Sequence, residues 1–417
     1  MSTWLVPRSE LTVDQLRVVE ASPTKHRLVF GLAGSGKTQV LVHRAAFLRE
    51  RYSVQDNTFR IFILTNVLRD YIRSGVAFLG LPDAAVSTFD AWCVDFYQNK
   101  ISRSLPWNST TRSPDFPKIR RLVLRFLRAN TNSQEPFSFV LVDEGQDLTN
   151  ESFEILKLIS RHVTVFADYL QQIYEGGAEI QNIADALGVS PQKAFLLGTY
   201  RNSPDVAQLA SYFISDRQRR AEYLSQVKSV MCERERPLLY VARDLDDEID
   251  RLASIIQQRQ FKNQRVGIIV PTNRHVHGLT TGLGRRGIVV EKAVPPPVKT
   301  RGTAATFVQF DSMAPKIASY HSAKGLTFDC VLMPRLTENA FSRIDGERRK
   351  RLLFVGMARA MQWIYLSTDR KTLREMAILE DAISNNHLVI QKSDGPQDVR
   401  LDKAAHVFDD DDGSSLL

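Results

Sequence analysis

Cysteine is scarce in this sequence. The 417 residues include three cysteines, Cys93, Cys232 and Cys330, and no two of them have C-x-x-C spacing. The scarcity argues against a disulfide framework and against a zinc site built on paired cysteines, and it is typical of a protein from a reducing compartment.

Long apolar runs are also missing. No uninterrupted run approaches the roughly 18 residues that a membrane-spanning helix needs. The stretch from Met1 to Arg8 lacks the apolar core of a secretory signal. The sequence therefore predicts a soluble, cytoplasmic protein without a membrane partner.

Acidic residues are too few to balance the basic ones. Lys and Arg together number 55 against 47 Asp and Glu, for a net charge of +8. This balance favours a polyanionic partner, although a basic solvated surface would explain it equally well. The apolar and charged fractions, 43% and 24%, are those of a globular protein, and the length predicts two or three domains.

One glycine-rich motif stands out. Residues 31–38, from Gly31 to Thr38, fit G-x-x-x-x-G-K-[ST] between an apolar strand-like stretch and an apolar helix-like one. Backbone N–H groups of such a loop surround a phosphate, its lysine binds the β and γ phosphates, and its Thr hydroxyl binds Mg²⁺. The motif therefore predicts an ATP and Mg²⁺ site formed by Gly31, Ala33, Gly34, Ser35, Gly36, Lys37 and Thr38.

Two adjacent carboxylates follow a later apolar stretch. Asp143 and Glu144 come directly after residues 138–142. Asp143 would hold Mg²⁺, and Glu144 would orient and deprotonate the attacking water. Acidic turns after strands are common, but together with Lys37 this pair predicts hydrolysis of a nucleoside triphosphate.

Polar and aromatic residues follow several other predicted strands. Thr65 and Asn66 end one such stretch, and Thr88 and Phe89 end the next. Both pairs could be ordinary caps and turns, or they could contact a nucleic-acid backbone, because ligands bind at the carboxyl ends of parallel strands. In the same way, Gln15 could pair with an adenine edge or simply be a surface residue.

The second half repeats the alternation of strands and helices. Strands are expected near 237–241, 265–270, 287–290, 317–319, 328–333 and 363–367. Helices are expected near 205–225, 246–260, 275–286 and 348–360, with a polar loop from His321 to Gly325. The pattern predicts an α/β protein with a second α/β layer.

Taken together and in chain order, the motifs resemble superfamily 1 helicases of the UvrD, Rep and PcrA type. The segments that carry the resemblance are Gln15, Gly31–Thr38, Thr65–Asn66, Thr88–Phe89, Asp143–Asp147, Asp168–Tyr174, Tyr200–Arg201, His321–Leu326 and Leu353–Ala360.

The resemblance implies two RecA-like P-loop domains with parallel sheets and ATP in the cleft between them. The first would span 1–198, with a short insertion at about 92–135, and the second 199–383. The residues from 384 to 417, which end in an acidic run, are expected to be a disordered tail.

The resemblance also assigns roles to residues. It implies catalytic roles for Lys37, Glu144, Gln171, Arg201 and Arg359, nucleotide-base contacts from Gln15 and Tyr200, and Mg²⁺ ligation by Thr38 and Asp143. It implies DNA contacts from Thr65, Asn66, Thr88, Phe89, His321 and Lys324.

The sequence departs from the family pattern in a few places. Glu175 stands where the family has an aromatic residue that stacks on a base, Thr327 replaces the usual Glu, and Ala358 replaces the usual Thr. The segments between Phe89 and Asp143 and between residues 270 and 317 are too short for the family's accessory insertions. A near-minimal motor is therefore expected.

These observations favour an ATP-dependent DNA translocase or helicase, stimulated by single-stranded DNA and of 3′ to 5′ polarity, in DNA repair, recombination or anti-phage defence. Its partner would be single-stranded or partly duplex DNA. One alternative is a DNA-sensing regulatory ATPase that acts with a protein partner such as a nuclease and does not unwind by itself. An RNA helicase is a third reading, because the motifs do not distinguish the sugar.

Overall fold

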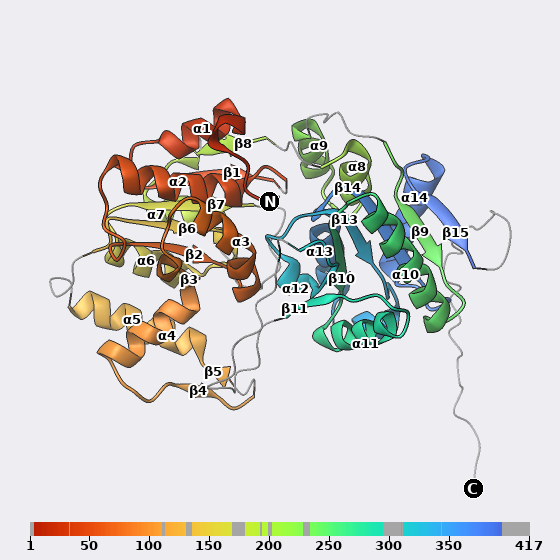
Figure 1. Cartoon of the computed structure of the whole chain (residues 1–417). Coiled ribbons are helices and arrows are strands. Elements are labelled where there is room, and N and C mark those ends of the chain that lie inside the picture. Colours follow the sequence, from red (N-terminus) through yellow and green to blue (C-terminus); the bar gives the residue numbers. More distant parts are fainter. Residues whose placement is uncertain are drawn as a thin grey trace, which may run out of the picture.

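The structure is a computed structural model that describes residues 4–32, 34–110, 113–130, 136–168, 180–191, 194–198, 202–227, 234–294, 310, 312–342 and 344–393. Two larger sheets, each parallel throughout, form the centres of two lobes, with the first half of the chain in one and the second half in the other (Figure 1). This confirms the predicted α/β class with two RecA-like domains. None of the helices in the described part is long and apolar enough to cross a membrane.

The first sheet has the strand order β3-β2-β6-β7-β1-β8. Its four inner strands, β2, β6, β7 and β1, are buried nearly throughout, as expected for a parallel sheet with helices on both faces. The strands are β1 (Arg27–Gly31), β2 (Phe59–Ile63), β3 (Val86–Thr88), β6 (Phe139–Val142), β7 (Val163–Ala167) and β8 (Phe195–Leu197).

Two hydrophobic cores lie on the two faces of this sheet. Val29 and Ile61 face one core together with α2 and α3, and their neighbours Leu28 and Phe62 face the other together with α4, α5, α6 and α7. The helices and 3-10 turns of this half are η1 (Arg8–Glu10), α1 (Val13–Glu20), α2 (Lys37–Arg51), α3 (Asn66–Phe78), η2 (Asp83–Ala85), α4 (Phe89–Lys100), α5 (Phe116–Ala129), η3 (Gly145–Asp147), α6 (Asn150–Ile159) and α7 (Ile180–Leu187).

The second sheet has the order β11-β12-β10-β13-β14-β9-β15. Its strands are β9 (Leu238–Val241), β10 (Val266–Val270), β11 (Glu291–Ala293), β12 (Lys316–Ser319), β13 (Phe328–Met333), β14 (Ala360–Thr368) and β15 (Val389–Lys392). Around it lie α8 (Pro204–Ser211), α9 (Arg217–Gln226), α10 (Leu245–Phe261), α11 (Asn273–Gly284), α12 (Tyr320–Ala323), η5 (Glu338–Phe341), α13 (Gly346–Met357), η6 (Arg374–Ile378) and α14 (Leu379–Ser384).

Four expectations for this half were wrong in detail. Residues 287–290 form no strand: Gly287, with φ of 76°, turns the chain, and the Ile288 N–H bonds back to the Leu283 carbonyl at 3.0 Å. The single helix expected at 205–225 is divided into α8 and α9, and the polar loop at His321 is the one-turn helix α12. The chain beyond 383 is not a disordered tail throughout, because β15 pairs in parallel with β9 at the edge of the sheet.

The expected insertion at 92–135 is small. A two-stranded antiparallel hairpin, β4 (Trp107–Asn108) and β5 (Ser113–Pro114), connects α4 to α5. Helix α5 begins at Phe116, because the Asp115 side chain accepts the Lys118 N–H and caps the helix. In Figure 1 these elements lie below the first sheet.

Candidate functional site

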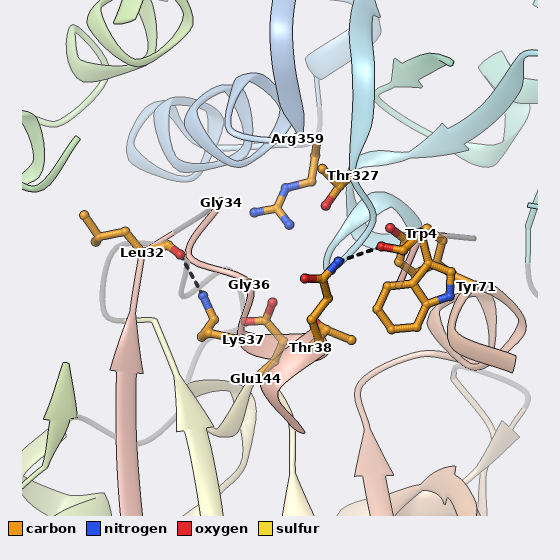
Figure 2. Close-up of a pocket in the computed structure, with 12 residues that line it drawn as sticks. Trp4, Leu32, Gly34, Gly36, Lys37, Thr38, Tyr71, Glu144, Thr327 and Arg359 are labelled. Atoms are coloured by element: carbon orange, nitrogen blue, oxygen red, sulfur yellow. Dashed lines mark hydrogen bonds between the residues drawn. The ribbon is translucent and has the colours of Figure 1, made fainter. Parts of the chain in front are cut away.

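The site lies at the edge of the first sheet where its parallel strands end. Strand β1 leads through the glycine-rich loop into α2, while Asp143 follows β6 and Asp168 follows β7. A pocket at this edge is lined by residues of both halves of the chain (Figure 2). They are Trp4, Leu32, Gly34, Gly36, Lys37, Thr38, Gln39, Tyr71 and Glu144 from the first half, and Gly325, Thr327 and Arg359 from the second.

The loop needs its glycines for geometric reasons. Gly34 and Gly36 have φ of 78° and 82°, which favour glycine, and Gly36 is the N-cap of α2. A Cβ added to Gly31 would lie 2.3 Å from the Ser35 hydroxyl, so a side chain there would force Ser35 to move. The N-terminus of α2 opens into the pocket without a side-chain cap, which suits it to a phosphate.

The ammonium of Lys37 is held over this loop. It donates to the Gly31 and Leu32 carbonyls at 2.7 and 3.2 Å, and it pairs with Asp168 at 3.3 Å. The side chain is buried, so a phosphate entering the loop would meet a charge with little competing water.

Thr38 and Asp143 present the oxygen atoms that a magnesium ion prefers. The Thr38 hydroxyl donates to Asp143 Oδ2 at 2.8 Å. Burial and the neighbouring Glu144 raise the pKa of Asp143 to about 6. A carboxylate destabilised in this way gains from a bound cation, so the pair fits Mg²⁺.

Glu144 is fixed in a strained position beside the loop. Its φ of 53° lies in the left-handed region, which costs a residue with a side chain. Its Oε2 accepts from Gln146 Nε2 at 2.5 Å, and Gln146 in turn accepts the Asp168 N–H at 2.9 Å. Burial works to raise the pKa of Glu144, but the charges of Lys324 and Lys37 lower it overall. The carboxylate is therefore ionised and able to accept a proton.

Arg359 enters the pocket from the second half of the chain. Its guanidinium donates to the Val355 and Leu326 carbonyls at 3.0 and 3.4 Å, and it points toward the glycine-rich loop (Figure 2). Burial lowers the pKa of Arg359, while the carboxylates of Glu144 and Asp168 oppose that shift. The arginine and Lys37 thus flank one space from two domains, in keeping with the cleft that the sequence predicts.

The comparisons with known proteins agree with this geometry. The AAA domain family model matches residues 15–177, and the model of the UvrD-like helicase C-terminal domain matches residues 309–371. The chain belongs to the UvrD-like helicases.

A curated relative of the chain is the "Probable DNA helicase" of Mycoplasma pneumoniae, 23% identical over 277 residues. The match covers 60% of this chain and 48% of the relative, so the chain spans about half the length of that protein. One similar solved structure is the C-terminal domain of a possible DNA helicase from Lactobacillus plantarum WCFS1. The match covers 46% of this chain and 99% of that domain, with 16% identity and a TM-score of 0.34.

Lys324 does not lie on a DNA-contacting surface, which corrects the prediction for it. Its ammonium has no exposed area, contacts Asp147 and lies 3.8 Å from Glu144. The adjacent Gly325 has φ of 81° and packs so closely on α3 that a Cβ there would lie 2.8 Å from Leu68. The loop after α12 thus places a cation of the second domain against carboxylates of the first. His321, half-buried on α12, remains a predicted DNA contact.

Gln15 supports the phosphate loop. Its Oε1 accepts the Thr12 N–H at 3.0 Å within a capping box, and its Nε2 donates to the Ser35 carbonyl at 3.0 Å. The same Nε2 would lie 2.8 Å from a Cβ at Gly36. Both ends of the amide therefore contact protein, and its recognition of adenine stays a prediction.

The predicted DNA contacts of the first half gather at one groove of about 610 Å³. Thr65 and Thr88 cap α3 and α4, each accepting a backbone N–H at 3.1 Å. Phe89 also lines the groove, although it is 3% exposed and its ring packs edge-on against Phe62 at 5.4 Å, so its DNA contact stays a prediction. The groove is also lined by Asn66, Phe116, Arg120, Asp143 and Asp147.

Four predicted site residues, Ala33, Gln171, Tyr200 and Arg201, lie outside the described residues. The roles predicted for them stay predictions.

One supporting residue was missed. Arg44 in α2 is fully buried and donates to three carbonyls at the C-terminal end of α1, those of Val18, Val19 and Ala21, at 2.8 to 3.1 Å. Burial lowers its pKa to about 10, so the guanidinium stays charged at neutral pH. The signal in the sequence was an arginine within an apolar helical stretch. Through α1, Arg44 fixes the helix that carries Gln15.

Arg44→Met should lower the free energy of unfolding by about 3 kcal/mol, because three carbonyls at the end of α1, two of them in buried bonds, lose a charged donor. Arg49→Met on the same helix is the matched control. Arg49 forms a partly exposed pair with Asp56, and its loss should cost at most about 1 kcal/mol. Urea denaturation measures both, and equal stability of the two variants would contradict the role given to Arg44.

Proposed function

We propose that the chain is an ATP-dependent DNA translocase or helicase whose ATPase is stimulated by single-stranded DNA. The observation that carries the proposal is that Lys37, Thr38 and Glu144 line one side of the pocket and Arg359 enters it from the second domain, with Asp143 bonded to Thr38. The 3′ to 5′ polarity and a place in DNA repair, recombination or anti-phage defence rest on the resemblance to the family.

Each side chain has a role in the proposed hydrolysis. Lys37 would bind the β and γ phosphates, and Thr38 and Asp143 would hold Mg²⁺, which would neutralise phosphate charge. Glu144 orients the attacking water and accepts its proton. Arg359 donates to the γ-phosphate and stabilises the charge that develops on it.

Motion follows from the origin of these groups in two domains. Because Arg359 and Lys324 come from the second half of the chain, the site is complete when the cleft is closed. Hydrolysis and product release would let the cleft reopen, and alternation of the two states would move the protein along a strand.

The groove is the proposed nucleic-acid site. It shares Asp143 with the metal-binding pair, and it also contains Asp147, the partner of Lys324. A strand lying against Thr65 and Thr88 would thus lie beside the loop that carries Glu144. This proximity gives a short physical path from strand binding to hydrolysis.

The test is the ATPase rate measured side by side with single-stranded DNA, duplex DNA and single-stranded RNA. We expect strong stimulation by single-stranded DNA and weaker stimulation by the other two. Unwinding of duplexes with a 3′ or a 5′ tail then tests polarity. An ATPase that does not respond to single-stranded DNA would refute the proposal.

A second candidate is a DNA-sensing regulatory ATPase that acts with a partner such as a nuclease. It is favoured by the size of the insertion, which amounts to α4, α5 and a short hairpin within the described residues. It predicts DNA-stimulated hydrolysis without separation of a partial duplex until the partner is added. Unwinding by the purified chain alone would exclude it.

A further inference from the structure

The hairpin β4–β5 carries an unusual tryptophan. Trp107 is 56% exposed and pairs with Pro114 across the hairpin. The base of the hairpin is closed by a hydrogen bond of 2.9 Å from the Asp115 N–H to the Pro106 carbonyl. Trp is enriched at binding interfaces, so an indole exposed on a surface hairpin is available to stack on a ligand. Figure 1 shows the hairpin at the lower edge of the first domain.

The hairpin adjoins the groove. Helices α4 and α5 run in the same direction, as two contacts between them show. Asp90 of α4 pairs with Arg120 of α5 at 2.6 Å. Six residues further along each helix, Phe96 packs on Phe126. Both helices therefore begin at the groove, where Phe116 forms part of the wall. Since β5 ends at Pro114, Trp107 lies close to that wall.

The surface near the hairpin is basic. Lys118, Arg121 and Arg125 lie on an exposed stripe of α5, and Arg103 is exposed in the segment before the hairpin. Within the ranges that the structure describes, none of the four forms an ion pair, whereas Arg120 and Arg128 of the same helix do. Exposed cations on the segments that flank a hairpin with an exposed indole suit a nucleic-acid strand, whose phosphates pair with cations and whose bases stack on aromatic rings.

We propose that Trp107, with Lys118 and Arg121, forms a second contact for single-stranded DNA, in which a base of the strand leaving the groove stacks on the indole. The inference rests on the proposed function, because it takes the groove as the DNA site. Trp107 would supply an aromatic platform that the sequence lacks at Glu175.

The test compares Trp107→Ala and Trp107→Phe with Phe261→Ala. Phe261 is a matched control, because it is 90% exposed but ends α10 in the second domain. The probe is a fluorescent oligothymidylate, and its affinity is measured by anisotropy at several salt concentrations. Trp107→Ala should weaken binding about 5- to 100-fold, Trp107→Phe much less, and Phe261→Ala hardly at all.

The charged part of the contact has a separate readout. Replacing Lys118 and Arg121 together with alanine should reduce the slope of log affinity against log salt by about 1.4, for two lost phosphate contacts. ATPase without DNA should stay unchanged in all these variants.

Two outcomes separate this inference from the proposed function. If the wild-type chain binds the oligonucleotide and Trp107→Ala binds it equally well, the inference is overturned while the proposed function stands. If the wild-type chain neither binds single-stranded DNA nor responds to it, the proposed function itself fails.

Discussion

Glu144→Gln is expected to abolish ATP turnover while leaving ATP binding intact. Loss of a general base typically costs a factor of about 10² to 10⁴ in rate. Gln146 donates to Glu144 Oε2, and a glutamine oxygen at 144 could accept the same bond, so the local geometry should survive. Steady-state ATPase and binding of a fluorescent ATP analogue give the two readouts.

Lys37→Ala is the companion variant. It removes the ammonium held over the loop by the Gly31 and Leu32 carbonyls, so ATP binding should be lost along with turnover. The contrast between the two variants separates the binding group from the base. Hydrolysis at the wild-type rate by Glu144→Gln would disprove the role assigned to that carboxylate.

The sequence predicted the central part of the site because backbone geometry constrains it. The φ values of Gly34 and Gly36 restrict which residues can stand there, and the loop conformation fixes where Lys37 and Thr38 point. Strand β6 likewise determines the place of Asp143. Motifs of this kind keep their geometry in any chain that folds around them, so residue order alone was sufficient.

Residues whose surroundings come from distant parts of the chain could not be placed in this way. The ring of Phe89 could equally have faced a strand of DNA or the core, and the packing of α4 on Phe62 turns it inward. Lys324 lies in a polar motif, but its partners are more than 170 residues away and become visible once two domains are docked. The positive charge of Lys324 therefore correctly predicted an anionic partner. That partner is a carboxylate of the first domain and not DNA.

The edges of the second sheet were the least predictable part of the fold. Strand β15 has four residues, two of them exposed, and it follows polar residues, so its apolar content does not distinguish it from a tail. It forms because β9 offers an unpaired parallel edge. The strand at this edge was predicted at 287–290, directly before the actual β11. Residues 287–290 are apolar, but they close the C-terminal end of α11.

Lys324→Met should have the largest effect on the coupling between the two domains. The ammonium is fully buried beside Asp147 and Glu144, so its removal leaves carboxylates in a low-dielectric interface without their cation. Breaking a buried ion pair from one side costs about 3 to 5 kcal/mol. We expect a loss of that size in the free energy of unfolding, measured by denaturation, together with loss of DNA-stimulated ATPase.

Two further variants show whether the ion pair itself is responsible. Asp147→Asn in the Lys324→Met background removes the carboxylate that was left without its cation. It should recover more than about 1 kcal/mol of the lost free energy of unfolding. A coupling of that size is not seen between distant sites. Lys350→Met removes a lysine from an exposed pair with Glu347 and should change stability by less than about 1 kcal/mol. If the Lys324 and Asp147 substitutions were simply additive, Lys324 would hold the second domain by packing alone, and the ionic link proposed between the two domains would have to be abandoned.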